Sequence, residues 1–450
     1  MLWKCASFTF DCQRPIIMGV VNVTPDSFSD GGQFNSFDRA LQHARDLQTR
    51  GAHIIDVGGE STRPGAQPVS EEEELVRCID VVRALAQEGM CVSIDTRHAR
   101  VARACVCAGA AIINDVSGFR DPEMRKVAAE CNAGLVVMHM KGDPTTMQQQ
   151  TNYTDIVAEV RDYLRERCNL LQEMGIARQR ICVDPGPGFG KTAEQSRTLM
   201  RNLQEFVHLG YAVMCAPSRK SYVGATYGIE KPLDRDEASA QEALMGAELG
   251  ACVLRMHNVD ATQAALKQFR PLAVVALGCN VALVDDAAQG VDAKIAQLNM
   301  AIGALCSLPD TTLVDASRFY ESEPAYKEDQ PAFVNAVVAL RTGIAPRDLL
   351  KYLHAIENSL GRVRTEENGP RTCDLDIIDY QLYVSDDEQL TLPHPRACER
   401  YFVVDPLREI MPSFVFANGV KLADAQPCFG KAEALTRSEA AYEPPAAQQE

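Results

Sequence analysis

The sequence has little of what membrane-spanning or nucleic-acid-binding proteins require. No apolar run approaches the roughly 18 residues that a membrane-spanning helix needs. Basic residues are outnumbered, since 45 Lys and Arg stand against 61 Asp and Glu and the formal net charge is −16. Nothing in such a chain offsets repulsion from phosphate, so we expect no nucleic-acid partner and no membrane. Any anionic ligand must then be held by a few local cations.

Paired cysteine motifs are also missing. The 16 cysteines are scattered among apolar stretches, and no Cys-x2-Cys pair occurs. Cys105 and Cys107 are separated by one residue, a spacing that suits neither zinc nor a redox loop. The first residues lack the charged region and apolar core of a secretory signal. We therefore expect a cytoplasmic protein with reduced, buried thiols.

The first 270 residues repeat one rhythm: a short apolar run, a polar or Gly-rich loop, and a stretch of helical period. Continuous apolar runs bounded by helices predict parallel strands covered on both faces. Eight such units favour an α/β fold of the TIM (β/α)₈ barrel type, with an open, doubly wound sheet as the alternative. The runs are Pro15–Val21, His53–Val57, Met90–Ile94, Ala111–Ile113, Gly134–Met138, Arg180–Val183, Tyr211–Cys215 and Ala251–Leu254.

Every predicted strand ends in polar or charged residues, and in a barrel these ends meet in one ring where active sites lie. Asp95, Asn114 and Asp184 would be partly desolvated there and could bind a flat heterocycle with an amino-pyrimidinone edge. Each could instead cap the following helix. The full set is Asn22, Asp56 with Glu60, Asp95, Asn114 with Asp115, His139, Asp184, Arg219 with Lys220, and Arg255 with His257.

The last two strands are where such barrels commonly bind phosphate. We therefore expect Arg219, Lys220, Arg255 and His257 to form a local anion clamp. Asn22 offers an oxygen suited to Mg²⁺ or a phosphate-bound water. The loops after the first two strands are rich in Ser, Asp and Gly and can close over a ligand, although simple surface turns remain the alternative.

The segment Gly188–Thr192 is similar to the end of a phosphate-binding Walker A loop. That motif needs a glycine five residues before Gly190, and Pro185 stands there. We therefore exclude a P-loop.

Five segments together resemble dihydropteroate synthase, in that family's order and over about residues 14–269. The resemblance implies a TIM barrel that joins 4-aminobenzoate to 6-hydroxymethyl-7,8-dihydropterin diphosphate and releases diphosphate, with one Mg²⁺ and a homodimer formed through the barrel. One departure is Asn258, where the family usually has Asp, and we expect little effect. The segments are Met18–Gly31, Asp56–Gly65, Ser93–Thr96, Asp184–Lys191 and Ser218–Ser221.

The same resemblance assigns ligand-binding positions. Those matching pterin ligands are Asp95, Asn114, Asp184 and Lys220, with Met138 and Phe189 against the ring. Those matching diphosphate and Mg²⁺ ligands are Asn22, Arg63, Arg255 and His257. Those matching the aminobenzoate pocket, where sulfonamides also bind, are Phe28, Thr62, Pro64, Lys220 and Ser221. Of these, Lys220, Arg255, His257 and Arg63 are the expected catalytic residues, in a dissociative substitution without a covalent enzyme intermediate.

The rhythm stops near residue 270, and we expect a second domain over 271–427. Its strands and helices do not alternate strictly, which predicts a ferredoxin-like α+β fold. We expect a disordered tail over 428–450, because that segment is small, polar and Pro-containing. The predicted elements are strands Ala273–Leu277, Thr312–Tyr320, Phe333–Leu340 and Cys373–Tyr380 and helices Lys294–Leu305 and Pro346–Leu360.

The Asp374-Leu-Asp376 sequence is the sharpest signal in this domain. Residues two apart in a strand share a face, and adjacent carboxylates repel unless a cation lies between them, so the pair suggests Mg²⁺. Arginines beside metal-binding carboxylates are typical of phosphoryl transfer. The alternative is an exposed edge strand that forms salt bridges with nearby arginines.

Together with Ala276–Asn280, Asp329–Ala336 and Leu392–Pro395, this motif resembles 6-hydroxymethyl-7,8-dihydropterin pyrophosphokinase over about residues 273–416. The resemblance implies diphosphate transfer from ATP, as a substrate, to the pterin, with two Mg²⁺ at Asp374 and Asp376. Pterin-binding positions are matched by Phe333, Asn335 and Phe402. Positions around ATP are matched by Glu357, Arg362, Arg364, Arg371, His394 and Arg400, with Arg362 and Arg371 expected to be catalytic.

This domain departs more from its family. Cys279 replaces a usual Ser, and Gln389 stands where an Arg often assists catalysis. We still expect activity. Two alternatives stay open: an active synthase fused to an inactive, structural kinase-like domain, and a pterin-binding methyltransferase barrel.

Overall fold

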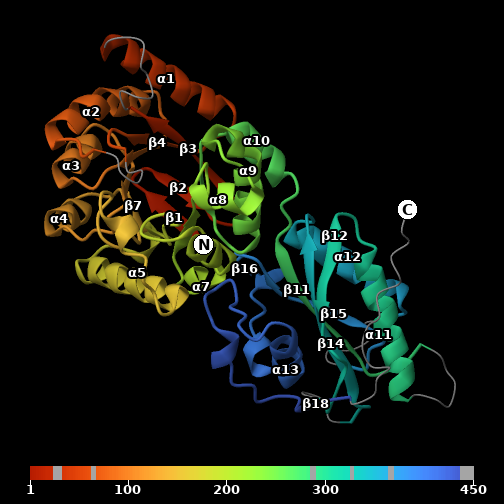
Figure 1. Ribbon diagram of the computed structural model, residues 1–450. Helices are drawn as coiled ribbons and strands as arrows, with labels where there is room; N and C mark the ends of the chain where they lie inside the picture. The colour runs from red at the N-terminus through yellow and green to blue at the C-terminus, as the bar shows by residue number, and fades with distance from the viewer. Residues whose placement is uncertain (24–32, 62–66, 284–289, 325–328, 363–368, 436–450) are drawn as a thin grey trace. The chain divides into compact units, whose positions relative to one another are not determined.

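The computed structural model describes residues 1–23, 33–61, 67–283, 290–324, 329–362 and 369–435 (Figure 1). The chain divides into two compact units, Met1–Phe269 and Arg270–Glu450. Within the described ranges, no helix combines the length and the hydropathy that crossing a membrane requires.

The first unit is a closed barrel of eight parallel strands, which confirms the TIM-barrel prediction and excludes the open sheet. Helices surround the strands (Figure 1). The strands, in barrel order, are β10 (Val253–Met256), β3 (Ile16–Asn22), β4 (Ile54–Gly58), β5 (Val92–Asp95), β6 (Ile112–Asp115), β7 (Gly134–Met138), β8 (Ile181–Asp184) and β9 (Ala212–Cys215).

Several helices of this unit begin where short polar side chains accept backbone N–H groups. Ser70, Asp121 and Asp155 cap α2, α4 and α5, and Thr192 forms a capping box with Gln195 at α6. The helices are α1 (Gln33–Thr49), α2 (Glu71–Gln87), α3 (Ala99–Cys107), α4 (Pro122–Glu130), α5 (Ile156–Glu173), α6 (Ala193–Arg201), α7 (Gln204–Val207), α8 (Ser221–Tyr227), α9 (Asp236–Glu248) and α10 (Val259–Leu266).

Alternation along the barrel strands decides which side chains enter the site. Ile55, Val57, Ile94 and Ile113 pack outward in the core shared with the helices. Their neighbours in the sequence therefore point into the barrel. The residues in this inward register near the carboxyl ends are Asp56, Ser93, Asp95, Asn114, Met138, Asp184 and Arg255.

A short hairpin that the sequence analysis did not predict precedes the barrel. It pairs β1 (Leu2–Cys5) with β2 (Phe8–Asp11). Trp3 is fully buried and donates its indole N–H to the carbonyl of Arg180, 3.1 Å away, just before β8.

The second unit is built on an antiparallel sheet in the order β15-β11-β14-β13-β18, with β12 also paired to β14. This order and the two crossover helices give the predicted ferredoxin-like topology. Helices α11 and α12 pack on one face, and α13 packs on the other (Figure 1). The elements are β11 (Leu272–Cys279), α11 (Val291–Cys306), β12 (Thr311–Ala316), β13 (Tyr320–Ser322), β14 (Phe333–Thr342), α12 (Pro346–Ser359), β15 (Asp374–Tyr380), α13 (Tyr401–Ile410) and β18 (Ala432–Ala434).

Three expectations for this unit need correction. The predicted strand Thr312–Tyr320 is two strands, because the pairing of β12 with β14 shifts register between Leu313 and Asp315 and β13 begins only at Tyr320. Helix α13 and the hairpin of β16 (Ser385–Asp387) and β17 (Leu390–Leu392) were not predicted. Disorder from residue 428 is wrong for 428–435, because β18 pairs with β13 there. Strand pairing uses backbone N–H and C=O groups, which an edge strand such as β13 leaves open, so the polar composition of this segment did not prevent pairing.

Candidate functional site

The mouth of the barrel is organised around one arginine. Arg255 on β10 places Nε 2.6 Å from Asp56 Oδ2 and Nη2 2.6 Å from Asp95 Oδ2. Asn114 Nδ2 donates to the same oxygen of Asp56 over 3.2 Å. Four strands therefore contribute one side chain each to a single buried polar network.

The charges in this network are unevenly balanced, because two carboxylates share one guanidinium. Burial raises the pKa of Asp95 to about 7 even though Arg255 opposes the shift. Burial alone would lower the pKa of Arg255, but Asp56 and Asp95 outweigh it and raise the pKa, so the guanidinium stays charged. Oδ1 of Asp56 and Oδ1 of Asp95 are buried and have no hydrogen-bond partner among the described residues. Two acceptors are thus available to a ligand that carries N–H groups.

Asp56 was predicted at a strand end, without a role in ligand binding. The signal was present, because Asp56 has the same inward register as Asn114, to which it is bonded. Its partner Arg255 lies 199 positions away in the sequence, so the pair became visible only once the barrel had closed.

A second group of predicted residues lines the mouth beside this network. Asp184 is buried and accepts from the backbone N–H of Gly186 over 2.7 Å. Burial raises the pKa of Asp184, and Lys220 opposes the shift. Burial likewise lowers the pKa of Lys220 to about 8, opposed by Asp184. Lys220 Nζ lies 5.0 Å from the centre of the Phe189 ring, and Phe189 packs on the apolar cluster that contains Met138. A flat apolar wall therefore stands next to a buried carboxylate.

The expected anion clamp forms only in part. His257 is held by Ser218, whose Oγ lies 2.8 Å from the ring Nδ1 and 3.0 Å from the backbone nitrogen of His257. Arg219 does not join it, because its guanidinium makes a two-bond ion pair with Asp236 at 2.7 and 2.8 Å. Asn258 donates to the same Asp236 over 3.2 Å and also caps α10. Asparagine thus fills a capping role that aspartate could also fill.

Asn22 and Ser221 are at the rim of this site. A Cβ on Gly58 would lie 3.8 Å from Asn22 Oδ1 and 3.6 Å from Asp95 Cβ, so both side chains flank that glycine. Ser221 is the first residue of α8 and is exposed. The predicted Phe28, Thr62, Arg63 and Pro64 lie outside the described residues.

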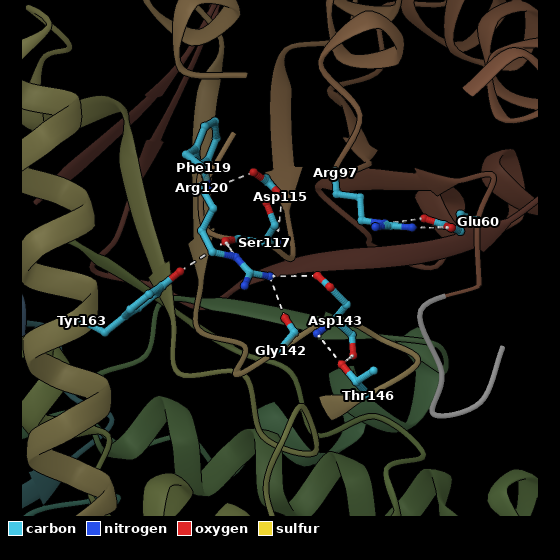
Figure 2. A network of polar contacts seen from close by, with 10 residues as sticks. All are labelled: Glu60, Arg97, Asp115, Ser117, Phe119, Arg120, Gly142, Asp143, Thr146 and Tyr163. Carbon is cyan, nitrogen blue, oxygen red and sulfur yellow. Dashed lines mark hydrogen bonds and ion pairs between the residues drawn. The ribbon is translucent and has the colours of Figure 1, made fainter. Parts of the chain in front are cut away.

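Polar contacts tie the loops at the mouth together (Figure 2). Arg97 makes two bonds to Glu60, at 3.0 and 3.1 Å, and Glu60 Oε1 also accepts from the backbone N–H of Val69 over 3.2 Å. Arg120 donates to the carbonyls of Ser117 and Gly142 at 3.0 and 2.7 Å. The loop after β4 is thereby linked to the loop after β5, and the loop after β6 is linked to the loop after β7.

The second unit has a cavity of about 270 Å³ against the sheet. Both carboxylates of the Asp-x-Asp motif face it, since Asp374 and Asp376 are both part of its lining. Most of the residues that line the cavity belong to the motifs singled out in the sequence. The lining consists of Ala276, Leu277, Gly278, Ser322, Glu323, Gln330, Phe333, Asn335, Arg362, Arg371, Asp374, Asp376, His394, Arg396, Arg400, Phe402 and Val403.

Asp374 is fixed by arginines on both sides. Its Oδ1 lies 2.7 Å from Arg362 Nη1 and its Oδ2 lies 2.5 Å from Arg371 Nη1. Arg362 also pairs with Glu357, which accepts from the backbone N–H of Leu375 over 2.8 Å. Strand β15 is indeed at the sheet edge and forms salt bridges, as the alternative proposed, but its carboxylates face the cavity rather than open solvent.

Asp376 has a looser environment, with its nearest arginine contact at 3.7 Å to Arg400. Burial and the neighbouring Asp374 raise the pKa of Asp376. This repulsion between two carboxylates is what a bound cation would relieve. The donor set therefore fits Mg²⁺, a hard cation that prefers carboxylate oxygens and retains several waters.

Two aromatic rings, those of Phe333 and Phe402, also line the cavity. Arg371 lies over Phe333 and Arg400 lies over Phe402, each 5.5 Å from the ring centre. Asn335 is buried and donates to Ser322 Oγ over 2.9 Å. Burial, with Arg400 nearby, lowers the pKa of His394 to about 4, so its ring is neutral at physiological pH.

Asn280 lies beside the cavity, whereas Gln389 lies away from it. The side-chain Oδ1 of Asn280 accepts from the backbone N–H of Arg371 over 2.8 Å. The backbone N–H of Asn280 donates to the carbonyl of Arg371 over 3.1 Å. Asn280 belongs to the Ala276–Asn280 motif, which predicted no separate role for it. Gln389 is exposed in the turn between β16 and β17 and does not line the cavity. Arg364 lies outside the described residues.

Comparison with known proteins gives the two units separate families. The family described as pterin binding enzyme matches residues 18–257, and the family described as 7,8-dihydro-6-hydroxymethylpterin-pyrophosphokinase matches residues 274–412. A dihydropteroate synthase of Synechocystis sp. is 44% identical over 251 residues, covering 55% of this chain and 87% of that protein.

Solved structures agree with this assignment of the first unit. The dihydropteroate synthase of Xanthomonas albilineans with 4-aminobenzoic acid is 41% identical, with a TM-score of 0.56, covering 59% of this chain and 96% of that chain. The enzyme of Burkholderia cenocepacia complexed with 7,8-dihydropteroate is 40% identical, with a TM-score of 0.54, covering 59% and 94%. The chain therefore belongs to the pterin binding enzyme family, as a barrel of the dihydropteroate synthase type joined to a hydroxymethylpterin pyrophosphokinase domain.

Proposed function

We propose that the chain performs two consecutive steps of folate biosynthesis with the residues described above. It is a bifunctional transferase: the second unit pyrophosphorylates 6-hydroxymethyl-7,8-dihydropterin with ATP, and the first condenses that product with 4-aminobenzoate to 7,8-dihydropteroate, releasing diphosphate. The observation that carries the proposal is the meeting of Asp56, Asp95, Asn114 and Arg255 at the barrel mouth, in the same chain as a cavity lined by Asp374 and Asp376.

In the synthase site, the free carboxylate oxygens suit the adjacent N–H and NH₂ groups of a pterin. Asp95, through its unpartnered Oδ1, and the buried Asp184 accept these hydrogen bonds, Asn114 supplies an amide, and Met138 with Phe189 contacts the ring. Burial raises the pKa of Asp95, which disfavours its charged form, and the N–H donors of a bound pterin would stabilise the anionic carboxylate. These assignments follow the resemblance and the burial of the acceptors.

The diphosphate leaves with growing negative charge, and cations at the rim stabilise it. Nε and Nη2 of Arg255 are taken by Asp56 and Asp95, which leaves its Nη1 to donate to the diphosphate. His257, held by Ser218, is a second donor, and the resemblance assigns the same role to Arg63. Asn22 would contribute one oxygen to a Mg²⁺ ion, which neutralises diphosphate charge when bound. The aniline nitrogen then attacks the electron-poor methylene carbon without a covalent enzyme intermediate.

In the kinase site, Asp374 and Asp376 would hold two Mg²⁺ ions, which neutralise the phosphate charges of ATP when bound. Arg362, Arg371 and Arg400 surround the carboxylates and bind phosphate oxygens. Phe333, Asn335 and Phe402 hold the pterin. His394 is neutral and binds the nucleotide through a hydrogen bond rather than a charge.

Two variants of the full-length chain test whether each unit performs one of the two reactions. Asp376→Asn removes one metal ligand, so AMP release from ATP should fall by at least about a hundredfold, while synthesis from added pterin diphosphate stays unchanged. Arg255→Met should show the reverse pattern. Mixing the two variants should restore dihydropteroate from hydroxymethyldihydropterin, ATP and 4-aminobenzoate. Asp348→Asn, at an exposed ion pair on α12, is the matched control.

A wild-type chain that releases no AMP but uses pre-made pterin diphosphate would support the alternative of an inactive, structural kinase-like unit. Loss of both activities in either variant would contradict the assignment of one reaction to each unit.

We also propose a homodimer formed through the barrel, in a reducing cytoplasmic setting. Tyr227 and Leu233, near the end of α8, are exposed apolar residues, and Leu233 is 70% exposed. All 16 cysteines are free thiols and most are buried, as is typical of reducing compartments. Light scattering of wild type and Leu233→Glu tests the dimer: the variant should be monomeric, and a monomeric wild type would contradict the proposal.

A further inference from the structure

The lysine of the excluded P-loop-like segment has a different use in the structure. Lys191 ends the loop between β8 and α6 and is 3% exposed. Its Nζ lies 2.9 Å from the carbonyl oxygens of Gly186 and Phe189, 3.2 Å from that of His139, and 2.9 Å from His139 Nδ1. No carboxylate forms an ion pair with it within the described ranges. A buried amine is therefore devoted almost wholly to backbone carbonyls.

The backbone of this loop is shaped to direct its carbonyls toward that amine. Gly186 and Gly190 have φ values of +64° and +63°, and a Cβ on Gly186 would collide with the carbonyl of His139. The loop consequently turns back on itself around Lys191. Phe189, in the same loop, packs its ring against the apolar cluster that contains Met138, and Lys220 Nζ lies over that ring.

Of the three carbonyls and His139 Nδ1, the amine can satisfy three in either protonation state. As an ammonium, it donates three hydrogens to the three carbonyls. As a neutral amine, it donates two hydrogens and accepts one from His139 Nδ1. Burial lowers the pKa of both Lys191 and His139, so the pair tolerates the neutral arrangement. Buried carbonyls left without donors would otherwise destabilise the loop.

We propose that Lys191 is a positioning residue for the synthase reaction: by binding the carbonyls of Gly186 and Phe189, it fixes the Phe189 ring and the backbone beside Asp184 where the pterin binds. The inference rests on the proposed pterin-binding roles of Phe189 and Asp184. Lys191 itself does not touch the substrate. Replacing Lys191 should therefore weaken the affinity for the pterin substrate and leave the affinity for 4-aminobenzoate nearly unchanged.

The test is Lys191→Met in the full-length chain, because methionine keeps an unbranched apolar stem up to Cε but has no amine to donate a hydrogen bond. The KM for hydroxymethyldihydropterin diphosphate should rise about tenfold, the equivalent of one lost charge-assisted hydrogen bond. The KM for 4-aminobenzoate should change little. Lys126→Met, which loses only an exposed ion pair with Glu123 on α4, is the matched control and should leave both values unchanged.

Chemical rescue separates positioning from a merely structural role. Lys191→Ala should lose pterin affinity and regain part of it in propylammonium, which supplies N–H donors and fills the vacated space. Tetramethylammonium carries the same charge without N–H groups and should not rescue.

Several results would overturn the inference. These are an unchanged pterin KM in both variants, an equal rise in the KM of both substrates, or loss of folded protein in both variants without rescue by propylammonium. The last result would assign Lys191 to barrel stability alone. If wild-type protein fails to use the pterin diphosphate, the proposed function itself fails, which is a separate outcome.

Discussion

Asp379 on β15 makes the stability of the second unit depend on pH. The residue is 4% exposed, and its Oδ1 accepts from the backbone N–H of Ala417 over 2.9 Å. No ion pair to it is found in the part of the chain that the structure describes. Burial raises its pKa to about 7, against about 3.9 in an unfolded chain. The folded state therefore binds this proton more tightly than the unfolded state.

The sign and size follow from that difference. Below about pH 4, both states are protonated and the carboxyl costs nothing; between pH 4 and 7, stability falls as pH rises, and above pH 7 the penalty is complete. A difference of about three pKa units corresponds to a ceiling of about 4 kcal/mol, and relaxation of the surroundings leaves about 2 kcal/mol as a working value. Asp379→Asn keeps an acceptor for Ala417 but never ionises. It should be more stable than wild type by about 2 kcal/mol at pH 8 and roughly equal to it near pH 4.

Hydrogen exchange measures this effect within the second unit. Opening free energies for the amides of β14, the central strand Phe333–Thr342, should show the difference when corrected for intrinsic rates at each pH. Asp424→Asn, at an exposed carboxyl in the same unit, is the control for general charge repulsion. A difference between Asp379→Asn and wild type that is the same at pH 5 and pH 8 would refute the reasoning.

Two further predictions concern the barrel. Arg255→Met leaves Asp56 and Asp95 without their cation and should lower the free energy of unfolding by about 3–5 kcal/mol. Urea unfolding, followed by the fluorescence of Trp3, the single tryptophan, measures this loss of stability. The loss should be smaller at pH 5, where Asp95 binds a proton. Equal losses at pH 5 and pH 8 would argue against the raised pKa of Asp95. Lys220, with its pKa lowered to about 8, should lose its charge as pH rises from 7 to 9, so pterin affinity should decline over that range. Lys220→Arg stays charged and should not show the decline, and a flat wild-type profile would contradict this role.

Much of the barrel could be predicted because its strands are short, buried and continuous in hydropathy. The predicted run His53–Val57 and the observed β4, Ile54–Gly58, differ by one residue at each end. Asp95 and Asn114 were placed correctly at the mouth, since the fold fixes where strands end. The hairpin at Leu2–Asp11 was missed, because its two short strands alternate without a long apolar run.

What the sequence could not supply was the choice of partners. Arg219 and Arg255 both follow late strands and looked equivalent, yet Arg219 pairs with Asp236 while Arg255 pairs inside the barrel. The register of the strands and the direction of each side chain decide this, and neither is local in sequence. For the same reason, the hydrogen bonds of Lys191 to the carbonyls of Gly186 and Phe189 could not be predicted from the Gly188–Thr192 motif.

The central claim is tested most directly by one coupled assay on the full-length protein. The mixture contains hydroxymethyldihydropterin, Mg²⁺ and labelled 4-aminobenzoate, with or without ATP. Labelled dihydropteroate that forms only when ATP is present is the predicted result, because each unit then supplies one step. No labelled product, either from this mixture with ATP or from added pterin diphosphate, would contradict the account.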